Sequence, residues 1–139
     1  MGTSQIFAID REESRLEMAR AQGARVINFE EDPVETIFSL TGNIGVDRVI
    51  EAVGVDAEPP NSGPAAEQSA QPEGQARDEP SQVAPETNPD GGLWVPGQAP
   101  SQSALWAAQC VKKVGTIGVT GVFPPQASPF RSGCSSSAT

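Results

Sequence analysis

The sequence predicts an α/β fold with a parallel sheet, and two observations support this prediction. Short apolar runs alternate with amphipathic segments, in the order strand, helix, strand, helix, strand, insertion, helix and strand. The runs are too short for helices and are apolar without alternation, as in parallel strands that are buried on both faces.

The first helix is predicted between strands at residues 5–10 and 25–29. Its first turn is acidic and its last turn holds Arg20, an arrangement that suits the helix dipole. Gly23 follows at the position where a glycine commonly ends a helix. The residues expected along its apolar side are Leu16, Met18 and Ala19.

The second helix is predicted before a third strand at residues 47–53. Asp32 is the expected N-cap, Pro33 takes the first helical position and Gly42 ends the helix. Its apolar stripe consists of Val34, Ile37, Phe38 and Thr41.

Residues 56–103 form a long insertion that is rich in proline and acid. This stretch contains 9 of the 13 prolines of the chain, and Arg77 is its one basic residue. Such a composition is typical of an acidic, solvated loop. Trp94 within it is expected to anchor the insertion on the domain or to mark a contact surface.

A last helix and strand follow the insertion. The helix is expected to begin after Ser101 or Ser103 and to stop at Gly115, before a strand at residues 116–120. The residues expected to point inward are Leu105, Ala108 and Val111, with Trp106 in the core and Lys112 and Lys113 in the last turn. Residues 1–122 are thus predicted to form one partial domain, and residues 123–139 an irregular tail.

Composition excludes several classes of function. The chain has no His, so Ser-His and Cys-His relays and His metal sites are excluded. Its two cysteines, Cys110 and Cys134, are too few and too far apart for a structural zinc site. The net charge of −9, without a basic cluster, argues against nucleic acid as a partner. No apolar run is long enough to span a bilayer, so we expect a cytoplasmic protein without a membrane partner.

Five segments carry a resemblance to a known family. FAIDR, RLEMARAQGA, VINFEEDPVETI, GVDRVIEAVGVD and VGTIGVTGVFPP occur in this order. As a set they resemble the coenzyme-binding half of the zinc-dependent medium-chain alcohol dehydrogenases. The match is nearest to the glutathione-independent formaldehyde dehydrogenase branch, where a long insertion is also familiar. The resemblance implies a Rossmann-type fold, NAD as coenzyme, and zinc in the intact relative.

The chain also departs from the pattern of that family. It has no GxGxxG motif, the loop that lets the backbone approach the coenzyme pyrophosphate. The resemblance therefore implies a truncated domain that lacks its first strand and phosphate loop, with the zinc ligands outside this chain. We expect weak or absent NAD binding and no hydride transfer. The alternative is a non-catalytic interaction module or subunit, which would use exposed strand edges or the acidic insertion to bind its own copy or another protein.

The resemblance implies coenzyme contacts at the carboxyl ends of three strands. Asp10 matches the acid that binds the adenosine ribose, although its position also suits an N-cap. Arg11 is either an adenine contact or an exposed arginine of the first helical turn. Val53 and Gly54 match the segment beside the adenosine and nicotinamide, and Gly121 and Val122 match the backbone that receives the carboxamide. The alternative is that these four residues are simply strand ends and turns.

Glu51 is unusual because it lies inside an apolar strand. A buried carboxylate needs a partner. Structural pairing with Arg48 or with a backbone donor is favoured over acid-base catalysis.

Overall fold

Strands and helices alternate along the part of the chain that the computed structural model describes, residues 5–69 and 97–123. In chain order the elements are β1 (Phe7–Asp10), α1 (Glu13–Ala21), β2 (Arg25–Asn28), α2 (Pro33–Leu40), β3 (Val46–Glu51), the 3-10 helix η1 (Gly54–Asp56), α3 (Gly63–Ser69), α6 (Gln102–Cys110) and β4 (Val111–Val119). The predicted α/β class is confirmed, and the alternation follows the apolar runs of the sequence.

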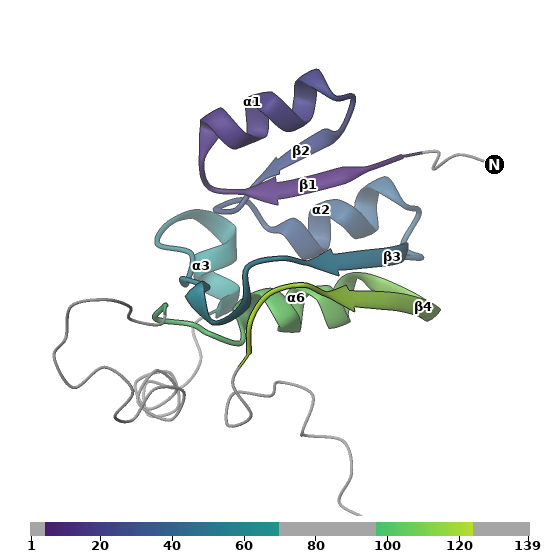
Figure 1. Ribbon diagram of the computed structural model, residues 1–139. Coiled ribbons are helices and arrows are strands. Elements are labelled where there is room, and N and C mark those ends of the chain that lie inside the picture. The colour runs from purple at the N-terminus through teal and green to yellow at the C-terminus, as the bar shows by residue number, and fades with distance from the viewer. Residues whose placement is uncertain (1–4, 70–96, 124–139) are drawn as a thin grey trace, which may run out of the picture.

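The four described strands form two separate parallel pairs. β1 pairs with β2, with Ile9 opposite Ile27, and β3 pairs with β4, with Val49 opposite Ile117. All four arrows point the same way in Figure 1, and β1 and β3 are the inner strands of the two pairs. Among the described strands, each therefore has one edge without a strand partner.

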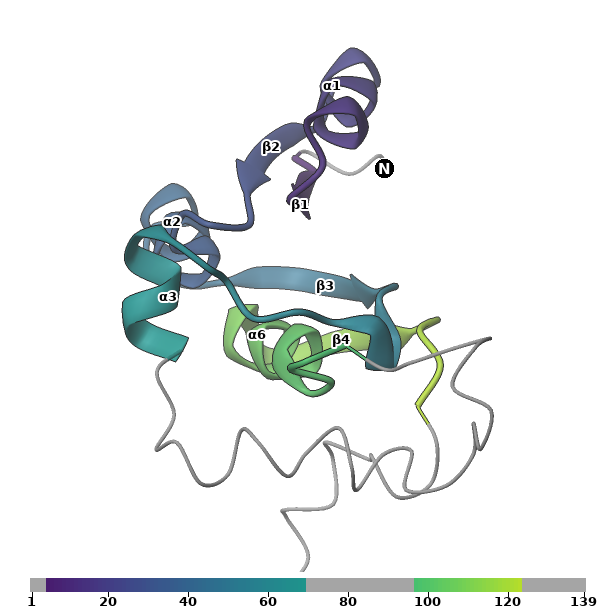
Figure 2. The same cartoon turned by 90° about the vertical axis from the view of Figure 1, so that its left-hand side faces the viewer.

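Helices cover the two pairs unequally. α1 packs on β1 and β2, whereas α2 contacts β2 and α6, and α6 contacts β3 and β4. Figure 2 shows α1 and α2 on different sides of the β1–β2 pair. The core lies where α2 and α6 meet the strands. It consists of buried Ile27, Ile37 and Cys110, with Phe7, Val34 and Val46 packed around them.

The ends of α1 and α2 lie where the sequence predicts them. Asp32 caps α2, because its Oδ1 accepts a 2.9 Å hydrogen bond from the Glu35 nitrogen. Gly23 and Gly42 follow the two helices with φ of +88° and +64°, the left-handed region that glycine tolerates. Leu16 is buried as expected, but the inward position expected for Met18 is wrong, since Met18 is 69% exposed.

The start of the insertion differs from the expected solvated loop. Residues 63–69 form α3, and Ala57 and Ala65 are buried. One oxygen of Glu30, Oε2, accepts hydrogen bonds of 2.8 Å from the backbone nitrogens of both Asn61 and Ser62. This carboxylate ties the segment before α3 to the loop after β2, which a composition argument cannot anticipate.

The two ends of the insertion lie together. Gly97 donates to the Val55 carbonyl at 2.8 Å, and Ala99 donates to the Ala57 carbonyl at 3.0 Å. Two expectations lie largely outside the described residues. They are the loop within residues 70–96, which includes Arg77 and Trp94, and the tail at 123–139, of which only Phe123 is described.

The inward face predicted for α6 is wrong by one position. Ala104, Ala107 and Cys110 are buried, while Leu105 is 39% exposed. A Cβ on Gly45 would lie 2.5 Å from the Cys110 carbonyl oxygen, so the end of this helix lies against backbone. Small side chains fit such an approach better than Leu.

The helix also ends earlier than predicted. α6 stops at Cys110, and β4 begins at Val111 with extended backbone, so Lys112 and Lys113 lie in a strand and not in a last helical turn. Lys112 pairs with Asp47 of β3. Pairing with β3 therefore extends the strand backward from the predicted residues 116–120.

Candidate functional site

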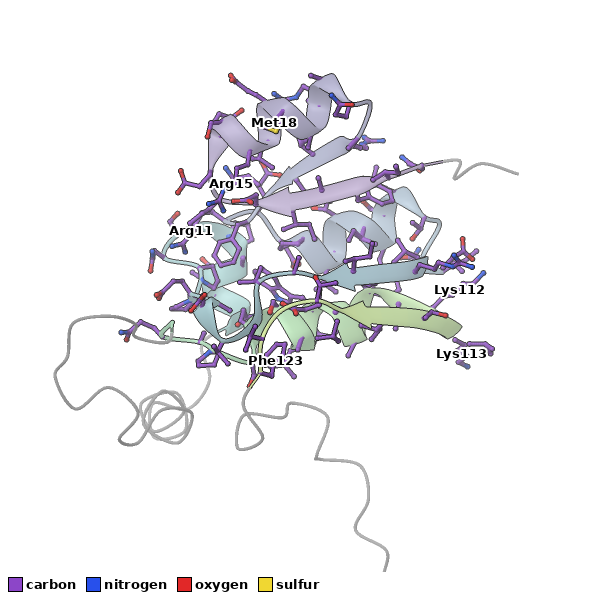
Figure 3. The ribbon with its side chains drawn as sticks, viewed as in Figure 1. Arg11, Arg15, Met18, Lys112, Lys113 and Phe123 are labelled. Carbon is purple, nitrogen blue, oxygen red and sulfur yellow. The ribbon has the colours of Figure 1, made fainter. Side chains whose placement is uncertain are left out.

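The six predicted site residues follow the carboxyl ends of three parallel strands, which is where open α/β sheets bind ligands. They are Asp10 and Arg11 at β1, Val53 and Gly54 after β3, and Gly121 and Val122 after β4. In Figure 3, Arg11 and Phe123 lie toward this end of the strands, and Lys112 and Lys113 lie at the opposite end.

The turns after β3 and β4 contact each other directly. Val55 donates a 3.0 Å hydrogen bond to the Val122 carbonyl. A Cβ on Gly54, whose φ is +70°, would lie 2.5 Å from the Val122 nitrogen. A Cβ on Gly121 would collide with the Gly54 nitrogen. Both glycines are therefore required for the close approach of the two turns.

Glu51 holds the turn that follows β3. Its side chain is 3% exposed. Its Oε1 accepts from the Val53 nitrogen at 2.9 Å, from the Gly54 nitrogen at 2.7 Å and from the Ser103 hydroxyl of α6 at 2.7 Å. The expected pairing of Glu51 with backbone donors is confirmed, and the hydroxyl of Ser103 is an addition that the sequence did not indicate.

The backbone of Glu51 also holds the turn that follows β4. Its carbonyl oxygen accepts from the Thr120 nitrogen at 2.8 Å, from the Thr120 hydroxyl at 3.0 Å and from the Gly121 nitrogen at 3.2 Å. One residue therefore positions both turns that contain predicted coenzyme contacts.

The second carboxylate oxygen of Glu51, Oε2, is buried and has no hydrogen-bond partner within the described ranges. It faces Gly121, since a Cβ there would collide with it. Arg48, the side-chain partner considered from the sequence, is three residues away on the same strand. An odd separation puts two side chains on opposite faces of a strand.

The N-cap of α1 is Glu12, so the alternative role of Asp10 as an N-cap is wrong, and Asp10 lies two residues before that cap. Its Oδ1 accepts a 3.0 Å hydrogen bond from the Glu12 nitrogen, just before α1. Its Oδ2 lies 3.5 Å from a guanidinium nitrogen of Arg15, and the Asp10 side chain is 29% exposed. The exposed part leaves room for a second role in binding a hydroxyl group.

Arg11 joins three segments that are far apart in sequence. Its guanidinium carbon lies 4.8 Å from the ring centroid of Phe29, a cation-π contact. Phe29 in turn meets Trp106 of α6 edge-on, with centroids 5.0 Å apart. Arg11 also donates a 3.2 Å hydrogen bond to the Pro59 carbonyl. The half-buried Trp106 therefore has an aromatic partner, which the sequence did not identify.

Two ionisable groups at the opposite end of β3 and β4 from the site, Cys110 and Asp47, have shifted pKa values. Burial, and then the charge of Asp32, raise the pKa of the Cys110 thiol to about 11. A hydrogen bond from Lys112 and its charge lower the pKa of Asp47. Cys110 is thus a protonated core residue at neutral pH, which agrees with the buried helix position expected from the sequence.

Within residues 5–69 and 97–123, no three His, Cys, Asp or Glu side chains are grouped so that they could hold a metal ion. No reaction step through zinc can be derived from these residues. No helix in the same ranges is long and apolar enough to cross a membrane.

The comparisons with known proteins concern the first part of the chain. Residues 1–62 match the family model of the zinc-binding dehydrogenases. Two curated proteins, each named alcohol dehydrogenase, are 48% identical to the chain over 58 residues; one is from Cupriavidus necator and the other from a named strain of that species. The aligned segment covers 40% of this chain but 16% of each relative. No solved structure matches the chain.

The matched segment runs from β1 to the residues just before α3. It contains Asp10, Arg11, Glu51, Val53 and Gly54, whereas Gly121 and Val122 lie outside it. The similarity to dehydrogenases therefore applies to the β1–α1–β2–α2–β3 unit.

Proposed function

We propose that this chain is a piece of the NAD-binding half of a zinc-dependent alcohol dehydrogenase, of the glutathione-independent formaldehyde dehydrogenase branch, and acts in the cytoplasm. One observation carries the proposal: the segment that matches the zinc-binding dehydrogenases coincides with an alternating βαβαβ unit. The acid at the end of β1, Asp10, is where such domains bind the adenosine ribose.

The proposal assigns coenzyme contacts to three parts of the candidate site. Asp10 and Arg11 would bind the adenosine part. Val53 and Gly54 would lie beside the adenosine and the nicotinamide, and Gly121 and Val122 would receive the carboxamide. The close contact between Gly54 and Val122 supports a single binding surface for the nicotinamide. When bound, NAD⁺ supplies the hydride acceptor of the reaction. The residues of this chain contribute binding and orientation.

We further infer that one additional parallel strand fits between β1 and β3. A dinucleotide-binding sheet has the strand order 3-2-1-4-5-6. The described order β2-β1 and β3-β4 corresponds to this order with position 1 open. The inner edges of β1 and β3, which have no strand partner in the described ranges, support the inference (Figure 1).

Without that strand and its phosphate loop, this chain would bind NAD weakly or not at all and would not transfer hydride. Phosphate contacts at a glycine-rich loop anchor the pyrophosphate in complete domains. The described residues do not contain the metal ligands that would polarise a substrate oxygen.

The test is a titration of the isotope-labelled chain with NAD⁺, followed by NMR. The amides of Asp10, Gly54 and Val122 should shift progressively, with half-saturation in the millimolar range. NADP⁺ should shift them less, because the Asp10 carboxylate repels its additional phosphate. Unchanged spectra at saturating NAD⁺ would contradict the assignment. Production of NADH from an alcohol by this chain alone would contradict the absence of hydride transfer.

A second candidate function is protein interaction through the open edges of β1 and β3. Unpaired edges are templates for strands of other chains, and the two separate pairs in this structure favour such a role. Sedimentation distinguishes the candidates. A concentration-independent monomer that binds NAD⁺ supports the coenzyme-binding piece, and a defined oligomer without NAD⁺ binding supports the interaction module.

A further inference from the structure

Two arginines lie beside Asp10 at the carboxyl end of β1. Arg11 follows it in the sequence, and a guanidinium nitrogen of Arg15, in the first turn of α1, lies 3.5 Å from its Oδ2. In Figure 3 both arginines lie toward this end of the strand. Guanidinium groups are not deprotonated in proteins. The end of β1 therefore presents two positive charges close to the acid that the proposed function assigns to the adenosine ribose.

The two arginines differ in how much of their binding capacity is already used. Arg11 lies over the Phe29 ring and donates to the Pro59 carbonyl. The Arg15 side chain is 70% exposed, and its distance from Asp10 is longer than the roughly 2.7–2.9 Å of a close charged hydrogen bond. Arg15 therefore has N–H donors that face water and can bind an acidic group.

A carboxylate at this place in a dinucleotide-binding sheet binds the 2′-hydroxyl of the ribose, whereas a nearby arginine accommodates a 2′-phosphate. Both groups are present here. A ligand group that reaches the exposed part of Asp10 also comes within reach of Arg15, because 3.5 Å separates the two side chains. Glu12 adds a negative charge at the N-cap of α1, and Glu13 pairs with Arg20. The attraction by Arg15 therefore offsets the repulsion of a phosphate only in part.

We propose that Arg15 determines how strongly this site discriminates against a 2′-phosphate, by attracting the phosphate that Asp10 repels. The ligand class is an adenosine nucleotide that carries a 2′-phosphate, such as NADP⁺. NAD⁺ remains preferred, but by a smaller factor than Asp10 alone would produce. The inference rests on the proposed function, because it requires the adenosine ribose to lie at Asp10. Arg15 is a specificity residue without a role in bond making.

The test compares the affinities of the full chain for NAD⁺ and NADP⁺ by NMR titration of the Asp10 amide. The substitution Arg15→Gln removes the charge from an exposed side chain. It should weaken NADP⁺ binding about threefold, the size of effect that an exposed charge pair produces, and leave NAD⁺ binding unchanged. An unchanged NADP⁺ affinity, or equal losses for the two coenzymes, would overturn the inference.

Arg20→Gln is the matched control. It removes the same charge from the same helix, five residues farther from Asp10, where the side chain is 55% exposed and pairs with Glu13. Both affinities should stay unchanged in this variant. Equal effects of the two substitutions would show that the net charge of the chain sets the preference, which would contradict a specific role of Arg15.

A measurement on the unsubstituted chain covers the case in which Arg15→Gln does not fold. Adenosine 2′-monophosphate should shift the side-chain Nε–H resonance of Arg15 further than adenosine or inorganic phosphate does at the same concentration. Equal shifts with adenosine or with inorganic phosphate would overturn the inference alone. Failure of adenosine, NAD⁺ and NADP⁺ alike to shift the Asp10 amide would instead refute the proposed function, and this inference with it.

Discussion

The Ser103 hydroxyl donates a 2.7 Å hydrogen bond to Oε1 of Glu51, across 52 positions of sequence. The contact joins α6, which follows the insertion, to the end of β3, which precedes it. It therefore links the two halves of the described structure at the candidate site.

Replacement of Ser103 by Ala should lower the free energy of unfolding by about 1 kcal/mol, because it removes a part-buried hydrogen bond to the Glu51 carboxyl group. Urea denaturation followed by circular dichroism measures the change. Ser39→Ala in α2 is the matched control, since the exposed Ser39 hydroxyl bonds only to the carbonyl of Thr36 in its own helix. Equal effects of the two substitutions would contradict a specific contribution from Ser103.

Replacement of Gly54 by Ala should destabilise the chain by more than 2 kcal/mol, because the new Cβ meets the backbone of Val122 in addition to the strain of a positive φ. Gly42→Ala is the control, since its φ of +64° is similar but no atom lies within 4 Å of the new Cβ. The Gly42→Ala substitution should lower the free energy of unfolding by only about 1 kcal/mol. Thermal unfolding measures the stability of the two variants. A smaller loss of stability for Gly54→Ala than for Gly42→Ala would show that the two turns are not in close contact.

Replacement of Glu30 by Ala should release the segment before α3. The Asn61 and Ser62 amides lose their acceptor, so their hydrogen exchange should become about tenfold faster, which corresponds to about 1.4 kcal/mol. Glu31→Ala removes the neighbouring exposed carboxylate and should leave these two amides unchanged. Unaltered exchange in Glu30→Ala would show that other contacts hold the segment.

Stability at alkaline pH should depend on Cys110. Its pKa is raised from 9.0 to about 11 in the folded chain, so the folded state holds this proton more tightly than the unfolded state does. The stability that the protonated Cys110 thiol gives the folded state is complete below pH 9, and it is lost as the pH rises toward 11. Between these values the free energy of unfolding should fall by about 2 kcal/mol more in the natural chain than in Cys110→Ala.

Urea titrations at several pH values measure this difference. Iodoacetamide should also modify Cys110 slowly in the folded chain at neutral pH, because the thiolate is the reactive form. Identical pH profiles for the natural chain and Cys110→Ala would contradict the raised pKa.

Local signals in the sequence predict α1 and α2 well. The Asp32 cap and the glycines at 23 and 42 act within a few residues of themselves, so their effects do not depend on distant contacts. The unusual acid in an apolar run, Glu51, was also recognisable, because burial of a carboxylate requires donors wherever the chain finds them.

The inward face of α6 shows where local signals fail. Hydrophobicity favours Leu105, yet the structure buries Ala104, Ala107 and Cys110. The short distance between this helix and the backbone at Gly45 determines which face of α6 is buried, and that distance is a property of the assembled fold. The early start of β4 has a similar origin, since pairing with β3 overrides the helical preference of the residues before Gly115.

The α/β class, the order of the elements and the acids at the ends of β1 and β3 could be predicted without the structure. They depend on apolar spacing, caps and single unusual residues. The sequence did not predict that the strands form two separate pairs, that Ser103 and two amides converge on one oxygen of Glu51, or that Gly54 meets Val122. The bond between Ser103 and Glu51 and the approach of Gly54 to Val122 join residues about 50 or more positions apart. The physical reason is that such contacts depend on how whole elements pack, and no local pattern of residues encodes that packing.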